Sequence, residues 1–208
     1  MNPRKSAAGR ALLLEKLTIV WSGIEAIVAL LSGIMAGSFA LVAFGADSGV
    51  EVMSALLVMV RLQALVRGEQ PDADKEHRSH RILAVLFFVL AAYVVASALF
   101  GLLNSNHPSE SILGLTITVA AAIAMPSLAF AKRRVSLVLT AAGSTSVGRL
   151  LKTDAAETAL CGWLSVSTLI GVVLGSWVGW WWADPVMSLA VVVLAVGEGR
   201  EAWACDLD

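Results

Sequence analysis

The sequence is poor in charge and in cysteine, and both shortages exclude whole classes of protein. Only 15% of its 208 residues are charged, where soluble domains average about a quarter. Apolar residues make up 58% and the mean hydropathy is +0.79. The two cysteines, Cys161 and Cys205, form neither a CxxC pair nor a Cys/His ligand string, so no disulfide framework is indicated. A soluble globule is excluded, and an integral membrane protein remains.

Two further absences narrow the function. The 15 basic residues are balanced by 16 acidic ones, so nothing indicates nucleic acid as a partner. The chain has no HExxH, no GxSxG, no phosphate-binding loop and no Ser/His/Asp set, so we expect it not to be an enzyme.

Six apolar stretches approach the roughly 20 residues that a helix needs to cross the hydrocarbon core. They lack the alternation of a membrane β-barrel. The sequence therefore predicts an all-α integral membrane bundle of six transmembrane helices at 15–203, between tails at 1–14 and 204–208. The sixth stretch is the weakest, because it needs tryptophans at the bilayer edge. The six are Leu17–Ala36, Phe39–Leu62, Ile82–Leu103, Ser111–Ala131, Asp154–Trp177 and Trp181–Val196.

The basic residues predict the orientation. All 15 lie in the N-terminal tail, in or beside the second and fourth connections (68–81 and 132–152), or at the C-terminus. Cytoplasmic loops retain Lys and Arg, so we expect both termini in the cytoplasm and a multi-pass protein of the cell membrane. A cleaved signal peptide is the competing interpretation of the N-terminus, but the first apolar stretch is too long and carries Glu25.

Five acidic residues fall inside the predicted spans, although each uncompensated carboxylate there costs roughly 2.5–3.5 kcal/mol. No Lys or Arg lies in the middle of a span, so an internal ion pair is not expected to compensate them. Two neutralisers are left, a proton on each acid or a cation brought from water. The five acids are Glu25, Asp47, Glu51, Asp154 and Glu157.

The spacing of these acids places them on shared helical faces. Asp47 and Glu51 are four residues apart. Asp154, Glu157 and Cys161 also share one face, and Cys161 reaches the depth of Asp47 if the two helices are neighbours. An alternative for Asp154 is an acid at a helix start, and for Cys161 a small buried hydrophobic residue. The sequence predicts a divalent-metal site of four ligands, with Glu25 and Asp154 as accessory candidates. The four ligands are Asp47, Glu51, Glu157 and Cys161.

Three segments carry a family resemblance. Gly45-Ala46-Asp47-Ser48-Gly49-Val50-Glu51, followed by Ser54 and Arg61-Leu62, resembles the second helix of the cation diffusion facilitator family. Lys152–Cys161 resembles the fifth helix of that family, and Ala183-Asp184-Pro185 the start of its last helix. The resemblance covers nearly the whole chain in order and topology. It implies a homodimeric exporter of zinc, cobalt, iron or manganese that takes up protons in exchange.

The chain departs from the family pattern at several positions. Glu157 stands where the family has His, and Cys161 where it has Asp, so the site is more permissive toward Mn or Fe. The large cytoplasmic C-terminal domain of many members is not expected, so the resemblance is to a short member. His77 and His80 resemble a His-containing loop in which some members bind a second metal; a solvated charged loop is the alternative.

The residues and the resemblance together predict proton-coupled efflux of a divalent cation, with no permanently bound cofactor. The alternative is a non-transporting binding or regulatory membrane protein that retains the fold. Metal-dependent uptake into vesicles distinguishes the two.

Overall fold

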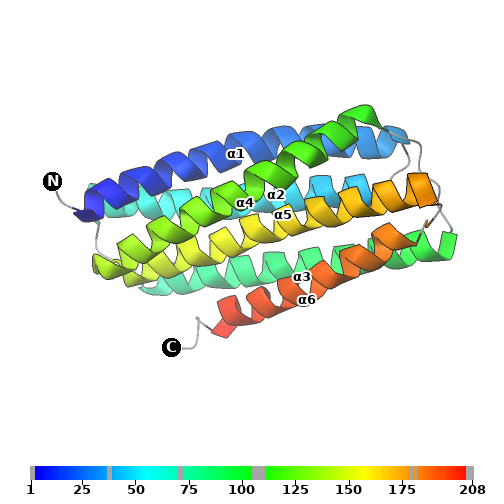
Figure 1. Cartoon of the computed structure of the whole chain (residues 1–208). Helices are drawn as coiled ribbons and strands as arrows, with labels where there is room; N and C mark the ends of the chain where they lie inside the picture. Colours follow the sequence, from blue (N-terminus) through cyan, green and yellow to red (C-terminus); the bar gives the residue numbers. More distant parts are fainter. Residues whose placement is uncertain are drawn as a thin grey trace.

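The computed structural model describes residues 3–36, 39–69, 73–104, 111–178, 180 and 182–204, and this part of the chain forms six α-helices and no strand (Figure 1). The all-α prediction is therefore confirmed for the described residues. The chain ends lie toward the same end of the bundle (Figure 1). The helices are α1 (Pro3–Ala36), α2 (Phe39–Arg67), α3 (Ala73–Asn104), α4 (Ile112–Ala141), α5 (Thr145–Val178) and α6 (Ala183–Ala204).

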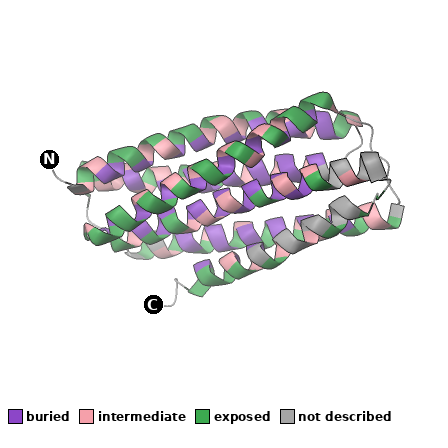
Figure 2. Cartoon of the chain, in the orientation of Figure 1, coloured by how far each residue is buried: buried purple, intermediate pink, exposed green. Residues whose placement is uncertain are grey.

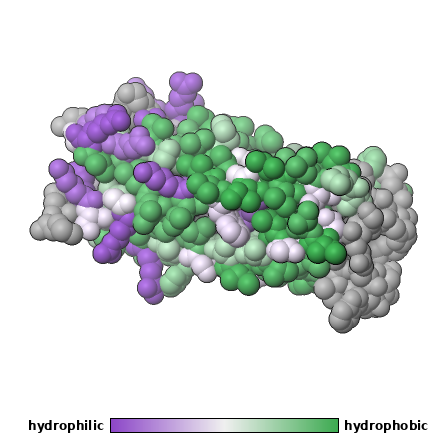
Figure 3. Space-filling model, turned by 90° about the horizontal axis from the view of Figure 1, so that it is seen from above, coloured by the Kyte–Doolittle hydropathy of each residue, from purple (hydrophilic) through white to green (hydrophobic). Residues whose placement is uncertain are grey.

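Four helices of the described part are long and apolar enough to cross a membrane: Arg4–Ala36, Leu41–Arg67, His77–Leu103 and Ile112–Ala141. The chain is thus a multi-pass helical protein by length and composition, while six spans and cytoplasmic termini stay predictions. Figure 3 shows hydrophobic side chains over the middle of the bundle and hydrophilic ones gathered at the end with the N-terminus. We call this the basic end, because the Lys and Arg positions fall in the halves of the helices that lead to it.

The helices extend further than the predicted spans, and the prediction of long polar connections is wrong in two places. The fourth connection, expected at 132–152, is a turn at 142–144 in which Gly143 has a φ of 82°. His77 and His80, expected in a loop, lie in the first turns of α3. An apolar stretch needs only to match the hydrocarbon core, which is about 30 Å thick. The 34 residues of α1 span about 51 Å, so this helix continues beyond its apolar stretch.

The burial pattern of α1 is the reverse of that of a helix in a soluble protein (Figure 2). Between Glu15 and Ser32 every buried residue except Ala29 is polar, and the exposed face is apolar at every third or fourth position. The apolar face of such a helix is stable against lipid, and its polar side chains must find hydrogen-bond partners inside the bundle. The buried polar residues are Glu15, Thr18, Ser22, Glu25 and Ser32, and the exposed apolar ones are Leu13, Leu17, Val20, Ile24, Ile27, Leu31 and Ile34.

The neighbours of α2 decide which polar groups meet. It packs against α1, α3 and α5, while α4 packs against α1 and α5. The condition that the second and fifth helices are neighbours is thereby fulfilled. At Gly45 the backbones of α1 and α2 approach closely, since a Cβ there would lie 2.8 Å from the amide nitrogen of Leu30.

A polar layer runs through the bundle between two apolar clusters. The cluster toward the basic end includes Ala11, Leu62, Leu139 and Leu151. The cluster on the other side is built from residues such as Ala29, Phe44, Met125 and Leu164. On α1, α2, α4 and α5 alike, the buried charged residues fall between these clusters along the chain. The layer is therefore sealed from both ends by packed apolar side chains.

Candidate cation site and a buried ion-pair network

The polar layer contains two centres. We call Glu25, Asp47, Glu51, Glu157 and Cys161 the acid cluster, and Glu15, Ser54, Lys132, Asp154 and Thr158 the lysine network. All ten side chains are buried. On α5, Asp154 precedes Glu157 by three residues and Cys161 by seven, so the network lies about 5–10 Å closer to the basic end.

Three helices bring ligand atoms together in the acid cluster. Glu25 of α1, Glu51 of α2 and Cys161 of α5 each offer one potential ligand atom, and these atoms lie within 4.8 Å of one another. Asp47 lies one turn from Glu51 on α2 and interacts electrostatically with both Glu51 and Cys161. A group of carboxylate oxygens and a thiol at this spacing has the size of a divalent-cation site.

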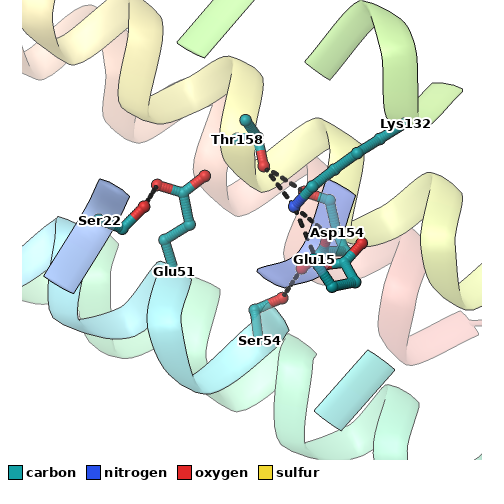
Figure 4. Close-up of polar contacts among 7 residues, drawn as sticks. All are labelled: Glu15, Ser22, Glu51, Ser54, Lys132, Asp154 and Thr158. Carbon is teal, nitrogen blue, oxygen red and sulfur yellow. Dashed lines mark hydrogen bonds and ion pairs between the residues drawn. The ribbon is translucent and has the colours of Figure 1, made fainter. Parts of the chain in front are cut away.

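Hydrogen bonds hold two of the acids in place. Ser22 Oγ donates to Glu51 Oε2 at 2.8 Å (Figure 4). Trp21 Nε1 donates to Glu25 Oε1, and Ser48 Oγ lies 3.5 Å from Glu25 Oε2. These donors orient both carboxylates and leave Oε1 of Glu51 without a hydrogen-bond partner among the described residues.

The acid cluster contains buried carboxylate oxygens that lack a hydrogen-bond partner of normal geometry. Within the described part of the chain, both Oδ atoms of Asp47, both Oε atoms of Glu157 and Oε1 of Glu51 are buried without a hydrogen-bond partner. Asp47 and Glu157 are each 1% exposed. Because an unpaired buried carboxylate oxygen is strongly unfavourable, these atoms need a proton or a cation.

The lysine network supplies its acids with a counter-charge from within the chain (Figure 4). Lys132 of α4 is fully buried, and its Nζ lies 2.5 Å from Asp154 Oδ2, 3.2 Å from Glu15 Oε2 and 3.1 Å from Thr158 Oγ1. Ser54 Oγ of α2 donates to Asp154 Oδ1 at 2.6 Å. The ammonium thus donates hydrogen bonds to Asp154 and Thr158 of α5 and forms an ion pair with Glu15 of α1, whose carboxylate oxygens have no hydrogen-bond partner in the part of the chain that the structure describes.

One prediction and one alternative are therefore wrong for Asp154. An internal ion pair does compensate it, and it is not an acid at a helix start, because α5 begins at Thr145. The sequence predicts Lys132 in the fourth connection, because the apolar stretch before it ends at Ala131. The sequence signal that locates this ion pair is equal spacing from the turn, since Lys132 and Asp154 are each eleven residues from Gly143. Equal rise along two antiparallel helices places them at one level.

The other candidates are distributed as follows. Glu157 interacts electrostatically with Asp154 of the lysine network and with Glu51 and Asp47 of the acid cluster, and it is not among the three residues whose ligand atoms lie within 4.8 Å of one another. His77 and His80 lie in α3, and the metal-sized group found among the described residues contains no histidine. Glu25, expected only as an accessory residue, reaches this group through the packing of α1 on α2.

Comparison with known proteins adds one match. The family model described as the cation efflux transmembrane domain matches residues 16–203, which include the whole acid cluster. No curated protein matches the chain.

Proposed function

Because the chain belongs to the cation efflux family, whose members are transporters of divalent cations rather than enzymes, we propose that it exports a divalent metal cation through the acid cluster. The observation that carries this proposal is the group of buried carboxylate oxygens without a hydrogen-bond partner of normal geometry among the described residues, on helices that also bring Cys161 to the site. The metal is the substrate, and no resident cofactor is part of the proposal.

In this proposal Asp47, Glu51, Glu157 and Cys161 hold the cation between α2 and α5. Glu25 adds a carboxylate from α1, since one of its oxygens lies within the metal-sized group. Ser22 and Trp21 keep Glu51 and Glu25 oriented toward the site. Four carboxylates and a thiol form an oxygen-rich donor set, which suits Mn²⁺ and Fe²⁺, while the sulfur adds affinity for Zn²⁺ and Co²⁺.

Exchange for protons follows from the same donors. Carboxylates and a thiol bind metal only when deprotonated, so arrival of the cation releases protons and its departure takes them up. Apolar layers on both sides of the site keep these charges apart from water, so access requires one end of the bundle to open. Efflux then corresponds to loading from the cytoplasm and release on the other side.

The proposal also extends to the setting of the protein. Both chain ends and the hydrophilic residues gather at one end of the bundle (Figures 1 and 3), which favours cytoplasmic termini in the cell membrane. The homodimer is carried over from the family resemblance.

The test is metal uptake into vesicles that contain the purified full chain and a pH-sensitive dye. We expect Mn²⁺, Fe²⁺, Co²⁺ or Zn²⁺ to move together with counter-moving protons, and the Asp47→Asn variant to lose this movement. Calorimetry in detergent shows whether the same ions bind. Binding without movement would identify a binding protein, and neither binding nor movement would refute the proposed site.

A further inference from the structure

The lysine network joins four helices at one level of the bundle. Lys132 of α4 contacts Glu15 of α1 and Asp154 of α5, and Asp154 accepts a hydrogen bond from Ser54 of α2. Lys132 precedes the end of α4 by nine residues, which is roughly 14 Å into the bundle from the basic end. An ion pair at this depth is not a surface contact.

The position of the network relative to the acid cluster is the second observation. Along α2, Ser54 follows Glu51 by three residues, and along α5, Asp154 precedes Cys161 by seven. The network therefore lies on the basic-end side of the acid cluster, on the same helices. A cation moving between the basic end and Cys161 along α2 and α5 must pass this level.

The charges explain why this level stays closed. One buried ammonium is shared by two buried carboxylates, and separating the helices would leave all three charges unpaired in a medium of low dielectric. Separation of the helices at this level therefore requires water or a cation to replace Lys132 as the partner of Glu15 and Asp154. A solvent-exposed ion pair would impose no such requirement.

We infer that the lysine network is the gate between the acid cluster and the basic end of the bundle, with Lys132 as its positioning residue. Lys132 holds α1, α4 and α5 together through oxygen atoms, and Ser54 attaches α2 to the same group. The inference rests on the proposed function, because a gate has a role only if a cation moves to and from the acid cluster.

The buried thiol of Cys161 provides a direct measurement of the gate. We would reconstitute the full chain carrying Cys205→Ser and follow modification of Cys161 by a membrane-impermeant maleimide added to either side. In the E15Q/K132M/D154N variant all three charges are removed together, so no unpaired charge remains. We expect labelling from the basic end to rise at least about fivefold, and labelling from the opposite end to stay unchanged.

The matched control is Lys152→Met. It breaks the Lys152–Glu201 pair on the same helix α5, with an Nζ–Oε1 distance of 3.1 Å, and these side chains are 53% and 59% exposed. Labelling of this control should equal that of the parent chain. If the triple variant does not fold, Ser54→Ala removes only the attachment of α2, and its labelling from the basic end should also rise.

Two results would overturn the inference. Equal labelling of the folded variants and the parent would make the network purely structural, and a rise from both sides would mean general loosening. The measurement involves no metal, so it is independent of the proposed function. A parent chain that binds no cation in calorimetry would refute the transport site and leave the labelling result to be judged on its own.

Discussion

The acid cluster and the lysine network are built from the same residue types at similar burial, and they differ in where their counter-charge comes from. In the network, Lys132 supplies a positive charge to Glu15 and Asp154 from within the chain. In the acid cluster, the oxygens of Asp47 and Glu157 lack a hydrogen-bond partner of normal geometry within the described part of the chain. The groups beside them, the Cys161 thiol and the Ser54 hydroxyl, carry no positive charge. A charge built into the chain makes a permanent connection between helices. A missing charge makes a place that an exchangeable ion can fill.

The largest effect should come from removing the built-in charge. Lys132→Met leaves the buried carboxylates of Glu15 and Asp154 without a counter-charge, so we expect the free energy of unfolding to fall by about 3–5 kcal/mol. Denaturant unfolding in detergent, followed by the tryptophan fluorescence, measures this loss. A stability equal to that of the parent chain would show that Lys132 is not a partner of these acids.

Removing an acid from the acid cluster should change the stability little and the metal affinity strongly. Asp47→Asn deletes a carboxylate that accepts no hydrogen bond of normal geometry from the described residues, so we expect the free energy of unfolding to change by no more than about 1 kcal/mol. Metal affinity should fall at least about 100-fold, since even groups that only orient a ligand contribute about 10–100-fold. Calorimetry and unfolding on the same preparation provide both values. A variant that is strongly destabilised but still binds metal would show that Asp47 has a structural role and is not a metal ligand.

The thiol tests the chemistry of the acid cluster more finely. Cys161→Ser keeps an oxygen where the sulfur stands, so we expect Zn²⁺ and Co²⁺ to lose affinity by about tenfold while Mn²⁺ changes little. The Co²⁺-loaded parent chain should show a sulfur-to-metal charge-transfer band that the variant lacks. An unchanged Co²⁺ spectrum would exclude Cys161 as a ligand.

The smallest effect should come from an ion pair in water. Lys152→Met breaks the exposed pair with Glu201, and we expect unfolding to change by less than about 1 kcal/mol. The comparison with Lys132→Met then isolates burial, because both substitutions remove one lysine from an ion pair with a carboxylate. Equal losses in the two variants would mean that burial does not determine the strength of the network.

Much of the fold could be predicted from hydropathy, because the length of an apolar run is a local property of the sequence. The helical class and the neighbouring acids of α2 and α5 follow from such runs and from the helical repeat. The ends of the helices could not be predicted in this way, since α4 continues past Lys132 to Ala141 where the chain has left the apolar run. The position of His80 was misjudged for the same reason, because α3 begins at Ala73.

The sequence by itself determined that buried acids exist and which of them share a helical face, since both follow from composition and a repeat of 3.6 residues. Only the tertiary structure decided which acid receives a partner. Asp154 meets Lys132 across the turn at 142–144, and Glu25 reaches Glu51 because Gly45 lets α1 and α2 approach closely. Pairing depends on the distance between helices, and that distance is set by packing rather than by the spacing of residues along one helix.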